Sequence, residues 1–347
     1  MTSLLTLLLS ATTLAPAAEP PAYKLETAFA QSIEANLTYE SHTPNLVARE
    51  WILFGARLVD LPGQVKTSST MEPGGREARE LSELRRPLWV GRVPADTPEH
   101  AKSIALFITI KADLLSRHLV ELRPGDKRPH APALGDKERQ ASLLSHGMID
   151  LKDAQFQQWL DTHELRRGKN ESDLDCARRT FLVIRKNFTY EYKAIMDRRT
   201  GLVCKLGRSD CGGLSSLFVA TLRTNKIPAR MLAGRWAQSD RKGAKLEGVE
   251  YHQWHVKSEF FAEGIGWVPV DMSAAVTQRG GKELAYFGHD HGDFVVFHLD
   301  ADFEVDTIHF GKAKLTWLQT PTWWVIGDGK VEPIKSTQDW QVRSKKK

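Results

Sequence analysis

The sequence predicts an α+β protein, in which a β-rich N-terminal domain precedes helices and then antiparallel strands. Residues 22–130 contain short strand-like runs, such as Ile104–Ile110, that are separated by turn signals. Residues 123–135 are rich in proline and glycine, which is typical of a linker. Beyond this linker, apolar residues recur at helical spacing up to about residue 224, and strand-like runs follow.

The length and composition fit a globular protein with more than one domain. The chain has 347 residues, of which 41% are hydrophobic and 26% are charged, so collagen-like and wholly disordered classes are excluded. The net charge is +5, and the basic residues occur in scattered pairs, so we expect no nucleic-acid partner. We predict a signal peptide over residues 1–18, a β-rich domain over 19–130, a linker with helices over 131–171, a core over 172–335 and a basic, solvated C-terminal tail over 336–347.

The N-terminus has the features of a secretory signal. An apolar run from Leu4 to Leu14 precedes the small residues Ala15-Pro16-Ala17, although no lysine or arginine stands before the run. The alternative is an apolar N-terminal helix. No other run approaches the roughly 18 apolar residues that a membrane span needs. We therefore expect export to the periplasm or cell exterior, without stable membrane insertion after cleavage.

A helix with a cysteine in its first turn is predicted from Cys211 to about Thr224. Its apolar residues fall at i, i+3, i+4 and i+8, and Pro228 follows its end. Unpaired N–H groups and the helix dipole favour a thiolate at such a position. The sequence therefore predicts a pKa for Cys211 below that of an ordinary thiol.

A β-hairpin is predicted from the strand-like runs 251–261 and 266–272. A turn centred on Glu263 places His255 directly opposite Asp271, where Cβ atoms lie about 4.5–5.5 Å apart. His252 points to the other face, because side chains alternate along a strand. The hairpin thus predicts one paired histidine and carboxylate.

These residues together form the parts of a nucleophilic site. A thiol nucleophile needs a base that accepts its proton and a carboxylate that orients the imidazole. The backbone N–H of Cys211 is a candidate for binding the oxyanion. Taken singly, each residue has a simpler interpretation: an apolar buried cysteine, a structural histidine and an aspartate that forms a turn. Their joint arrangement favours the catalytic interpretation.

Two motifs resemble those of the transglutaminase-like superfamily. The run "DCGGLSSLFVATLRTNKIPAR" is similar to its cysteine motif, and "HVKSEFFAEGIGWVPVD" is similar to its histidine motif, within residues 172–273. The resemblance implies a papain-like α+β core in which Cys211 is the nucleophile, His255 the base and Asp271 the orienting acid.

The resemblance also marks two further positions. An aromatic residue upstream of the cysteine commonly assists the oxyanion in this superfamily, and Tyr190 in "FTYEY" is the candidate here, with core packing as the alternative. Lys257 stands two residues after His255, where the family often has an aromatic side chain.

The expected function is therefore that of an exported, thiol-dependent acyl-transfer enzyme. It attacks an amide or isopeptide bond of a protein or peptide, with a cell-wall peptide as one candidate, and we expect no cofactor and no metal. Hydrolysis by a cysteine protease or amidase is favoured over cross-linking by a protein-glutamine acyltransferase, because no dedicated calcium site or amine channel is recognisable. The alternative is a non-catalytic module with this fold that binds proteins or glycans.

The remaining motifs carry less functional weight. Cys176 and Cys204 could form a disulfide that leaves Cys211 free, or both could be reduced; the sequence leaves this open. The pair His289 and His291 is expected in a polar turn rather than in a metal site.

Three tryptophans near the C-terminus could stack on a sugar or peptide, but we expect them to close a core. They are Trp317, Trp323 and Trp324.

Overall fold

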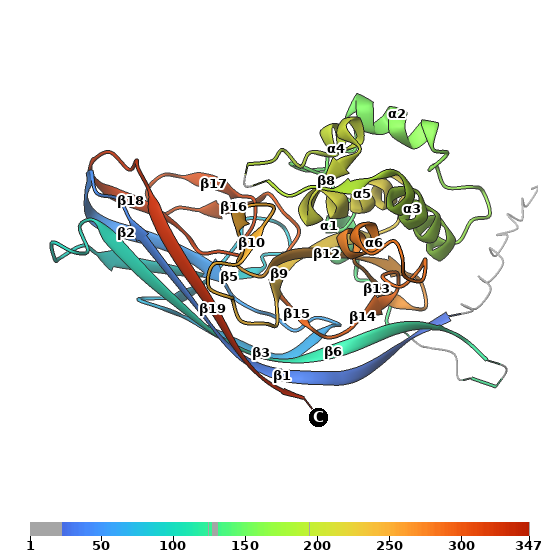
Figure 1. Cartoon of the computed structure of the whole chain (residues 1–347), viewed down its shortest axis with the longest axis horizontal. Coiled ribbons are helices and arrows are strands. Elements are labelled where there is room, and N and C mark those ends of the chain that lie inside the picture. The colour runs from blue at the N-terminus through green and yellow to red at the C-terminus, as the bar shows by residue number, and fades with distance from the viewer. Residues whose placement is uncertain (1–22, 124, 127–130, 194, 347) are drawn as a thin grey trace, which may run out of the picture.

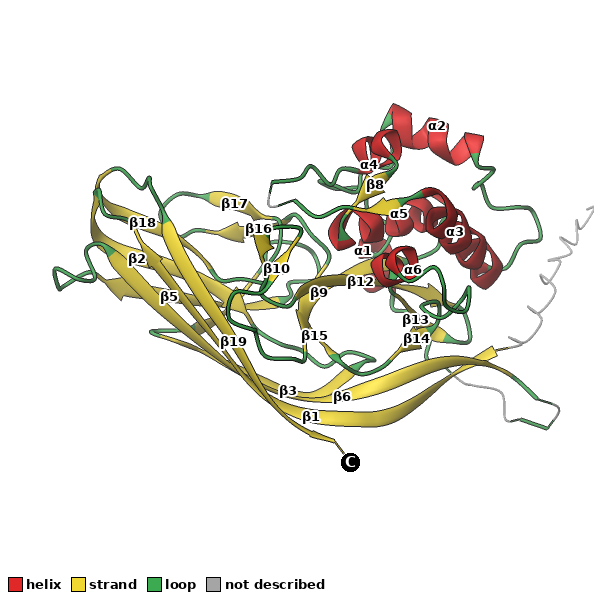
Figure 2. Ribbon diagram, viewed as in Figure 1, coloured by secondary structure: helices red, strands yellow, loops and turns green. Residues whose placement is uncertain are grey.

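The computed structural model describes residues 23–346 except 124, 127–130 and 194. The predicted signal peptide lies outside these residues. The chain is an α+β protein, as predicted: long antiparallel strands form most of it, and the helices gather at one end (Figure 2). Within the described ranges, no helix has the length and apolar character needed to cross a bilayer.

The first part is a sandwich of two antiparallel sheets, built from N-terminal strands together with strands from the C-terminal end of the chain. One sheet has the order β14-β6-β1-β19, with β3 beside β6, and the other has the order β18-β2-β5-β4. The two sheets approach closely, since a Cβ atom added at Gly55 would lie 2.7 Å from Ile108 in the facing sheet. The strands are β1 (Tyr23–His42), β2 (Leu46–Ala56), β3 (Gln64–Glu72), β4 (Arg76–Arg79), β5 (Pro87–Pro94), β6 (Ser103–Glu121), β14 (His289–Asp290), β18 (Thr322–Gly329) and β19 (Lys335–Lys346).

Two sequence predictions for this part are wrong. The strands are long rather than short, since β1 has 20 residues and β6 has 19. The described residues of the predicted tail, 336–346, form a strand instead: β19 pairs along β1 from Lys335 to Lys346. Trp340 is the reason, because its side chain is fully buried in the sandwich and its indole N–H donates to the Trp236 carbonyl at 2.9 Å.

The second part is a helical layer packed on an antiparallel sheet of order β13-β12-β9-β15. The helix α5 is central, because nearly all of its residues are buried between the sheet and the other helices. The strands are β9 (Ala229–Trp236), β12 (Trp254–Ala262), β13 (Gly266–Val270) and β15 (Phe294–Leu299); the helices are α1 (Asp136–Ala141), α2 (Ala154–Thr162), α3 (Asp173–Asn187), α4 (Thr200–Leu206), α5 (Cys211–Thr224) and α6 (Met272–Thr277).

Short two-residue strands connect and border this core. β7 (Thr189–Tyr190) pairs in parallel with β8 (Arg208–Ser209), and β10 (Lys245–Leu246) forms a small hairpin with β11 (Val249–Glu250). A separate hairpin of β16 (Phe303–Asp306) and β17 (Lys312–Leu315) precedes the return of the chain to the sandwich.

The hairpin of β12 and β13 differs in register from the prediction. Ser258 pairs with Val270 and Ala262 with Gly266, so the turn is centred on Gly264, whose φ is +76°. Continued by one residue, this register places Asp271 opposite Lys257, so His255 is its diagonal neighbour. A shift of two residues preserves the face to which each side chain points.

The two parts share the strand β6, which leaves the sandwich and runs beneath the core sheet (Figure 1). There His118 of β6 pairs with His289 of β14. The buried Arg117 donates to Glu259 of β12 at 2.9 Å. The sandwich therefore contacts the same strand that carries His255.

Candidate active site

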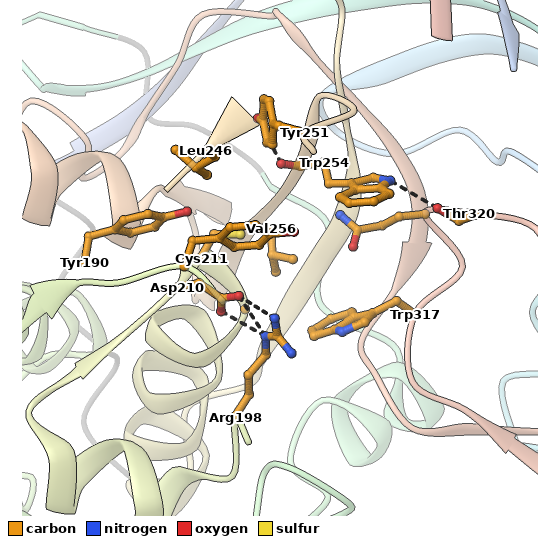
Figure 3. Close-up of a pocket in the computed structure, with 13 residues that line it drawn as sticks. Tyr190, Arg198, Asp210, Cys211, Leu246, Tyr251, Trp254, Val256, Trp317 and Thr320 are labelled. Atoms are coloured by element: carbon orange, nitrogen blue, oxygen red, sulfur yellow. Dashed lines mark hydrogen bonds and ion pairs between the residues drawn. The ribbon is translucent and has the colours of Figure 1, made fainter. Parts of the chain in front are cut away.

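Cys211 is the first residue of α5 and lies against the open edge of β12. The strand β13 pairs with β12 only as far as Ser258. The main chain of Val256 therefore lies beyond the end of β13, and this edge of β12 is open there. The Ser215 hydroxyl, one turn along α5 from Cys211, donates to the Val256 carbonyl at 3.2 Å. Cys211 is 9% exposed and lines a cavity that Val256 also lines (Figure 3). The cysteine thus lies beside the residue that follows His255.

His255 and Asp271 form a buried hydrogen-bonded pair. Nε2 of His255 lies 2.8 Å from Oδ2 of Asp271. The other carboxylate oxygen, Oδ1, caps α6 by accepting the N–H of Ala274 at 3.0 Å and the Ser273 hydroxyl at 3.1 Å. Burial disfavours the carboxylate charge, yet His255 and Lys257 hold the pKa of Asp271 well below its usual range. Because an ionised carboxylate only accepts, Nε2 carries the hydrogen and Nδ1 is the basic nitrogen.

The imidazole ring is held in place by aromatic neighbours. Trp236, at the end of β9, stacks on His255 with ring centroids 4.3 Å apart and an interplanar angle of 25°. Phe294 presents its edge at 5.8 Å. The Gln319 amide donates to the His255 carbonyl at 2.7 Å. Sequence reasoning did not identify these three residues.

The predicted fall in the pKa of Cys211 is wrong. Burial raises the pKa of this thiol, and the Asp210 and Asp271 carboxylates act in the same direction. The main-chain N–H of Val256 and the Arg198 guanidinium oppose the rise without cancelling it. The helix terminus therefore does not create a free thiolate, and the thiol needs a neighbouring base to lose its proton.

The start of α5 is fixed by an ion pair that the sequence did not reveal. Arg198 donates to Asp210 through Nε, at 3.0 and 2.9 Å, and through Nη2, at 2.6 Å. Asp210 also caps α5 by accepting the Gly213 N–H at 3.2 Å. The pair neutralises the charge next to Cys211.

Replacing Asp210 by asparagine is expected to lower the free energy of unfolding by about 3 kcal/mol, because Arg198 would keep its largely buried charge without a counterion. The matched control is Asp197→Asn, which removes an exposed pair with Arg199 and should cost less than about 1 kcal/mol. Urea unfolding followed by circular dichroism measures both values. Equal losses in the two variants would contradict the assigned role of the buried pair.

Tyr190 lies across the cavity from Trp317 and points toward Cys211 (Figure 3). It belongs to β7 and pairs with Ser209, two residues before the cysteine. Burial and the neighbouring Cys211 raise the pKa of its phenol, so the hydroxyl keeps its hydrogen and remains a donor. Trp317 lines the cavity, whereas Trp323 and Trp324 pack on the sandwich through Trp51 and Phe54, as expected for a core.

The other candidate residues lie elsewhere. His252 forms its own pair with Asp240, whose Oδ2 lies 2.9 Å from Nδ1. His289 contacts His118 on β6, and the described residues contain no group of three or more ligands suited to a metal ion.

All three cysteines are free thiols. Cys176 in α3 is buried, and Cys204 in α4 is partly exposed. The disulfide that the sequence left open is not formed between them.

Fold and site together define a papain-like α+β protein with a buried cysteine at the start of its central helix. Residues 162–272 match the family model of the transglutaminase-like superfamily. This match confirms, for that segment, the superfamily that the motifs predicted.

Known proteins resemble the chain in part or in fold. An uncharacterized protein of Haemophilus influenzae is 28% identical over 120 residues, which are 31% of this chain and 32% of that protein, so the match spans about a third of the relative. The crystal structure of a "putative cysteine protease" from Cytophaga hutchinsonii has the same fold, with a TM-score of 0.55 and 12% identity over 92% of each chain. The periplasmic domain of TgpA from Pseudomonas aeruginosa has a TM-score of 0.37 and 12% identity over 72% of this chain and 91% of that one.

Proposed function

We propose that the chain is a thiol-dependent acyl-transfer enzyme that attacks amide bonds through Cys211, His255 and Asp271. The observation that carries this proposal is the hydrogen bond between His255 and Asp271, at 2.8 Å, on the strand whose open edge receives Cys211. The match to the transglutaminase-like superfamily and the shared fold support the same class of enzyme.

In the first half of the reaction, the Cys211 sulfur attacks the carbonyl carbon and Nδ1 of His255 takes the thiol proton. Because burial raises the pKa of the thiol, this transfer accompanies the attack rather than preceding it. The negative carbonyl oxygen accepts hydrogen bonds from the Cys211 N–H and the Tyr190 hydroxyl. The C–N bond then breaks, the amine leaves with the proton from His255, and a thioester remains.

In the second half, His255 removes a proton from water, and the resulting hydroxide attacks the thioester. The carboxylic acid leaves and the thiol regains its proton, so atoms and charge balance. An amine in place of water would give a new amide, which is cross-linking when both partners are proteins. We propose hydrolysis as the main outcome.

We also propose export to the periplasm or cell exterior. The apolar N-terminal run supports this part of the proposal. A protein or peptide is the proposed substrate, and a cell-wall peptide is one candidate.

A generic activated ester tests the chemistry without knowledge of the natural substrate. p-Nitrophenyl acetate should acetylate Cys211, giving a burst of p-nitrophenolate and an acetyl group that peptide mass spectrometry locates on that residue. Hydroxylamine should remove it, as expected for a thioester. If Cys211 remains unmodified in the folded protein, the enzyme proposal fails and a module that binds proteins or glycans becomes the better interpretation.

The same acetyl-enzyme distinguishes hydrolysis from transamidation. With n-butylamine present, its decay should release mainly acetate, and N-butylacetamide should be the minor product. Predominant N-butylacetamide would reverse the proposed preference while leaving the nucleophile established.

A further inference from the structure

The cavity beside Cys211 indicates which substrates the enzyme accepts. We propose that this cavity binds the acyl side of the substrate and selects an uncharged aromatic or aliphatic side chain there. The inference rests on the proposed function of Cys211. It adds the chemical class of the group next to the scissile amide.

The position of the cavity assigns it to the acyl side. The leaving amine must take its proton from His255, which does not belong to the cavity wall. Trp317, in contrast, lies directly against the start of α5: a Cβ atom added at Gly212 would be 3.1 Å from its Cζ2 atom. We therefore infer that a group bound against Trp317 lies beside the first turn of α5, on the acyl side of the scissile bond.

Aromatic side chains form a large part of the walls, and the size suits a single side chain. The volume is about 270 Å³, near the lower end of the roughly 300–1,000 Å³ of small-ligand pockets. Aromatic walls of this kind bind apolar groups by excluding water from both surfaces. The aromatic and aliphatic lining residues are Tyr190, Tyr192, Leu246, Tyr251, Trp254, Val256 and Trp317.

The charged members of the lining form a neutral pair. Arg198 and Asp210 neutralise each other through three short contacts. Burial raises the pKa of Tyr190, Tyr192 and Tyr251, so these phenols carry no charge. An ionised substrate group would lose its hydration here without finding a free counterion.

Three polar members, Trp254, Gln319 and Thr320, are already engaged with the protein. The Trp254 indole N–H donates to the Thr320 hydroxyl at 3.1 Å. The Gln319 amide donates to the carbonyls of Gly234, at 2.8 Å, and His255, at 2.7 Å. These bonds hold this part of the wall in place.

The selective residues come from segments outside or at the border of the core motifs. Trp317, Gln319 and Thr320 follow β17, beyond the segment 162–272 that matches the superfamily. Leu246 belongs to the hairpin of β10 and β11, whose tip is held because the Glu247 carboxylate accepts the Tyr192 N–H at 2.9 Å.

The test measures acylation of Cys211 by four p-nitrophenyl esters, each rate being divided by the rate with N-acetylcysteine to remove intrinsic reactivity. The acyl groups are 3-phenylpropanoyl, hexanoyl, anionic succinyl and cationic 4-(trimethylammonio)butanoyl. We expect both neutral groups to acylate at least tenfold faster than either charged group. Equal rates, or a preference for a charged group, would overturn the inference while leaving the proposed function intact. Absence of acylation by all four esters and by p-nitrophenyl acetate would overturn both.

Two substitutions assign the preference to the cavity walls. Trp317→Ala should reduce the ratio of 3-phenylpropanoyl to acetyl transfer at least tenfold, and Trp317→Phe should restore most of it. Leu246→Lys should raise the ratio of succinyl to hexanoyl transfer at least tenfold. Val249→Lys, which adds the same charge to the same hairpin outside the cavity wall, should leave that ratio unchanged. Unchanged ratios in both Trp317→Ala and Leu246→Lys would contradict the assignment.

Discussion

Replacing Cys211 by alanine is expected to lower the rate of acylation by p-nitrophenyl acetate by at least about 10³-fold, to the background of the folded protein. The expected loss is this large because removing the nucleophile of a concerted catalytic group costs nearly as much as removing the whole group. The burst of p-nitrophenolate, followed in a stopped-flow spectrophotometer, gives the rate.

Cys204→Ala is the matched control for this prediction. Burial raises the pKa of the Cys204 thiol to about 12, so this thiol is protonated at neutral pH. The burst should therefore survive in Cys204→Ala. A burst that survives in Cys211→Ala and disappears in Cys204→Ala would place the reactive thiol on α4 instead of α5 and refute the proposed site.

Replacing Asp271 by asparagine is expected to slow acylation by about 10²–10⁴-fold while leaving the fold intact. Asparagine caps helices about as well as aspartate, so Oδ1 can still accept the Ala274 N–H. At the Oδ2 position, however, an NH₂ group would donate where His255 needs an acceptor. The imidazole would then carry its hydrogen on Nδ1, the nitrogen that must receive the thiol proton.

Two further substitutions separate the cap from the catalytic contact. Asp271→Ala should lose both the cap of α6 and the contact with His255. The missing cap should lower the free energy of unfolding by about 1 kcal/mol. Asp271→Ser should recover stability but not rate, because a hydroxyl can cap α6 but carries no charge. Thermal unfolding and the acylation rate are measured on the same samples. Wild-type rates in Asp271→Asn would show that the carboxylate serves α6 alone.

Local patterns predicted the elements that carry the site. The helix Cys211–Thr224 has the predicted bounds, and the strands Ala229–Trp236 and Phe294–Leu299 lie where strand-like runs were expected after it. Each of them begins directly after a proline or an aspartate, so a local signal marks its start. The contact of His255 with Asp271 was also foreseen, although the register was wrong, because the shift of two residues preserved the face.

What the sequence did not predict depends on contacts between distant segments. Trp236 and Gln319 reach His255 from other strands and loops, and nothing in their local sequence marks them. The pKa of Cys211 rises because the folded chain buries the thiol between carboxylates, which a local helix argument does not include. The strand β19 is polar and shows no alternation of apolar residues. Its one buried side chain, Trp340, is held by the sandwich, and this contact is not visible in the local sequence.

The rate of iodoacetamide labelling at Cys211 as a function of pH tests the central claim most directly, since it requires no substrate. Peptide mass spectrometry gives the rate in wild type, in His255→Ala and in His252→Ala. The last variant is a matched control, because His252 is also buried and also hydrogen-bonded to a carboxylate.

Wild type and His252→Ala should label at equal rates near neutral pH. His255→Ala should label at least about tenfold more slowly there and recover only in alkaline solution, since burial raises the pKa of a thiol that has lost its base. If His255→Ala and wild type give the same pH profile, His255 does not act on Cys211 and the proposed chemistry is wrong.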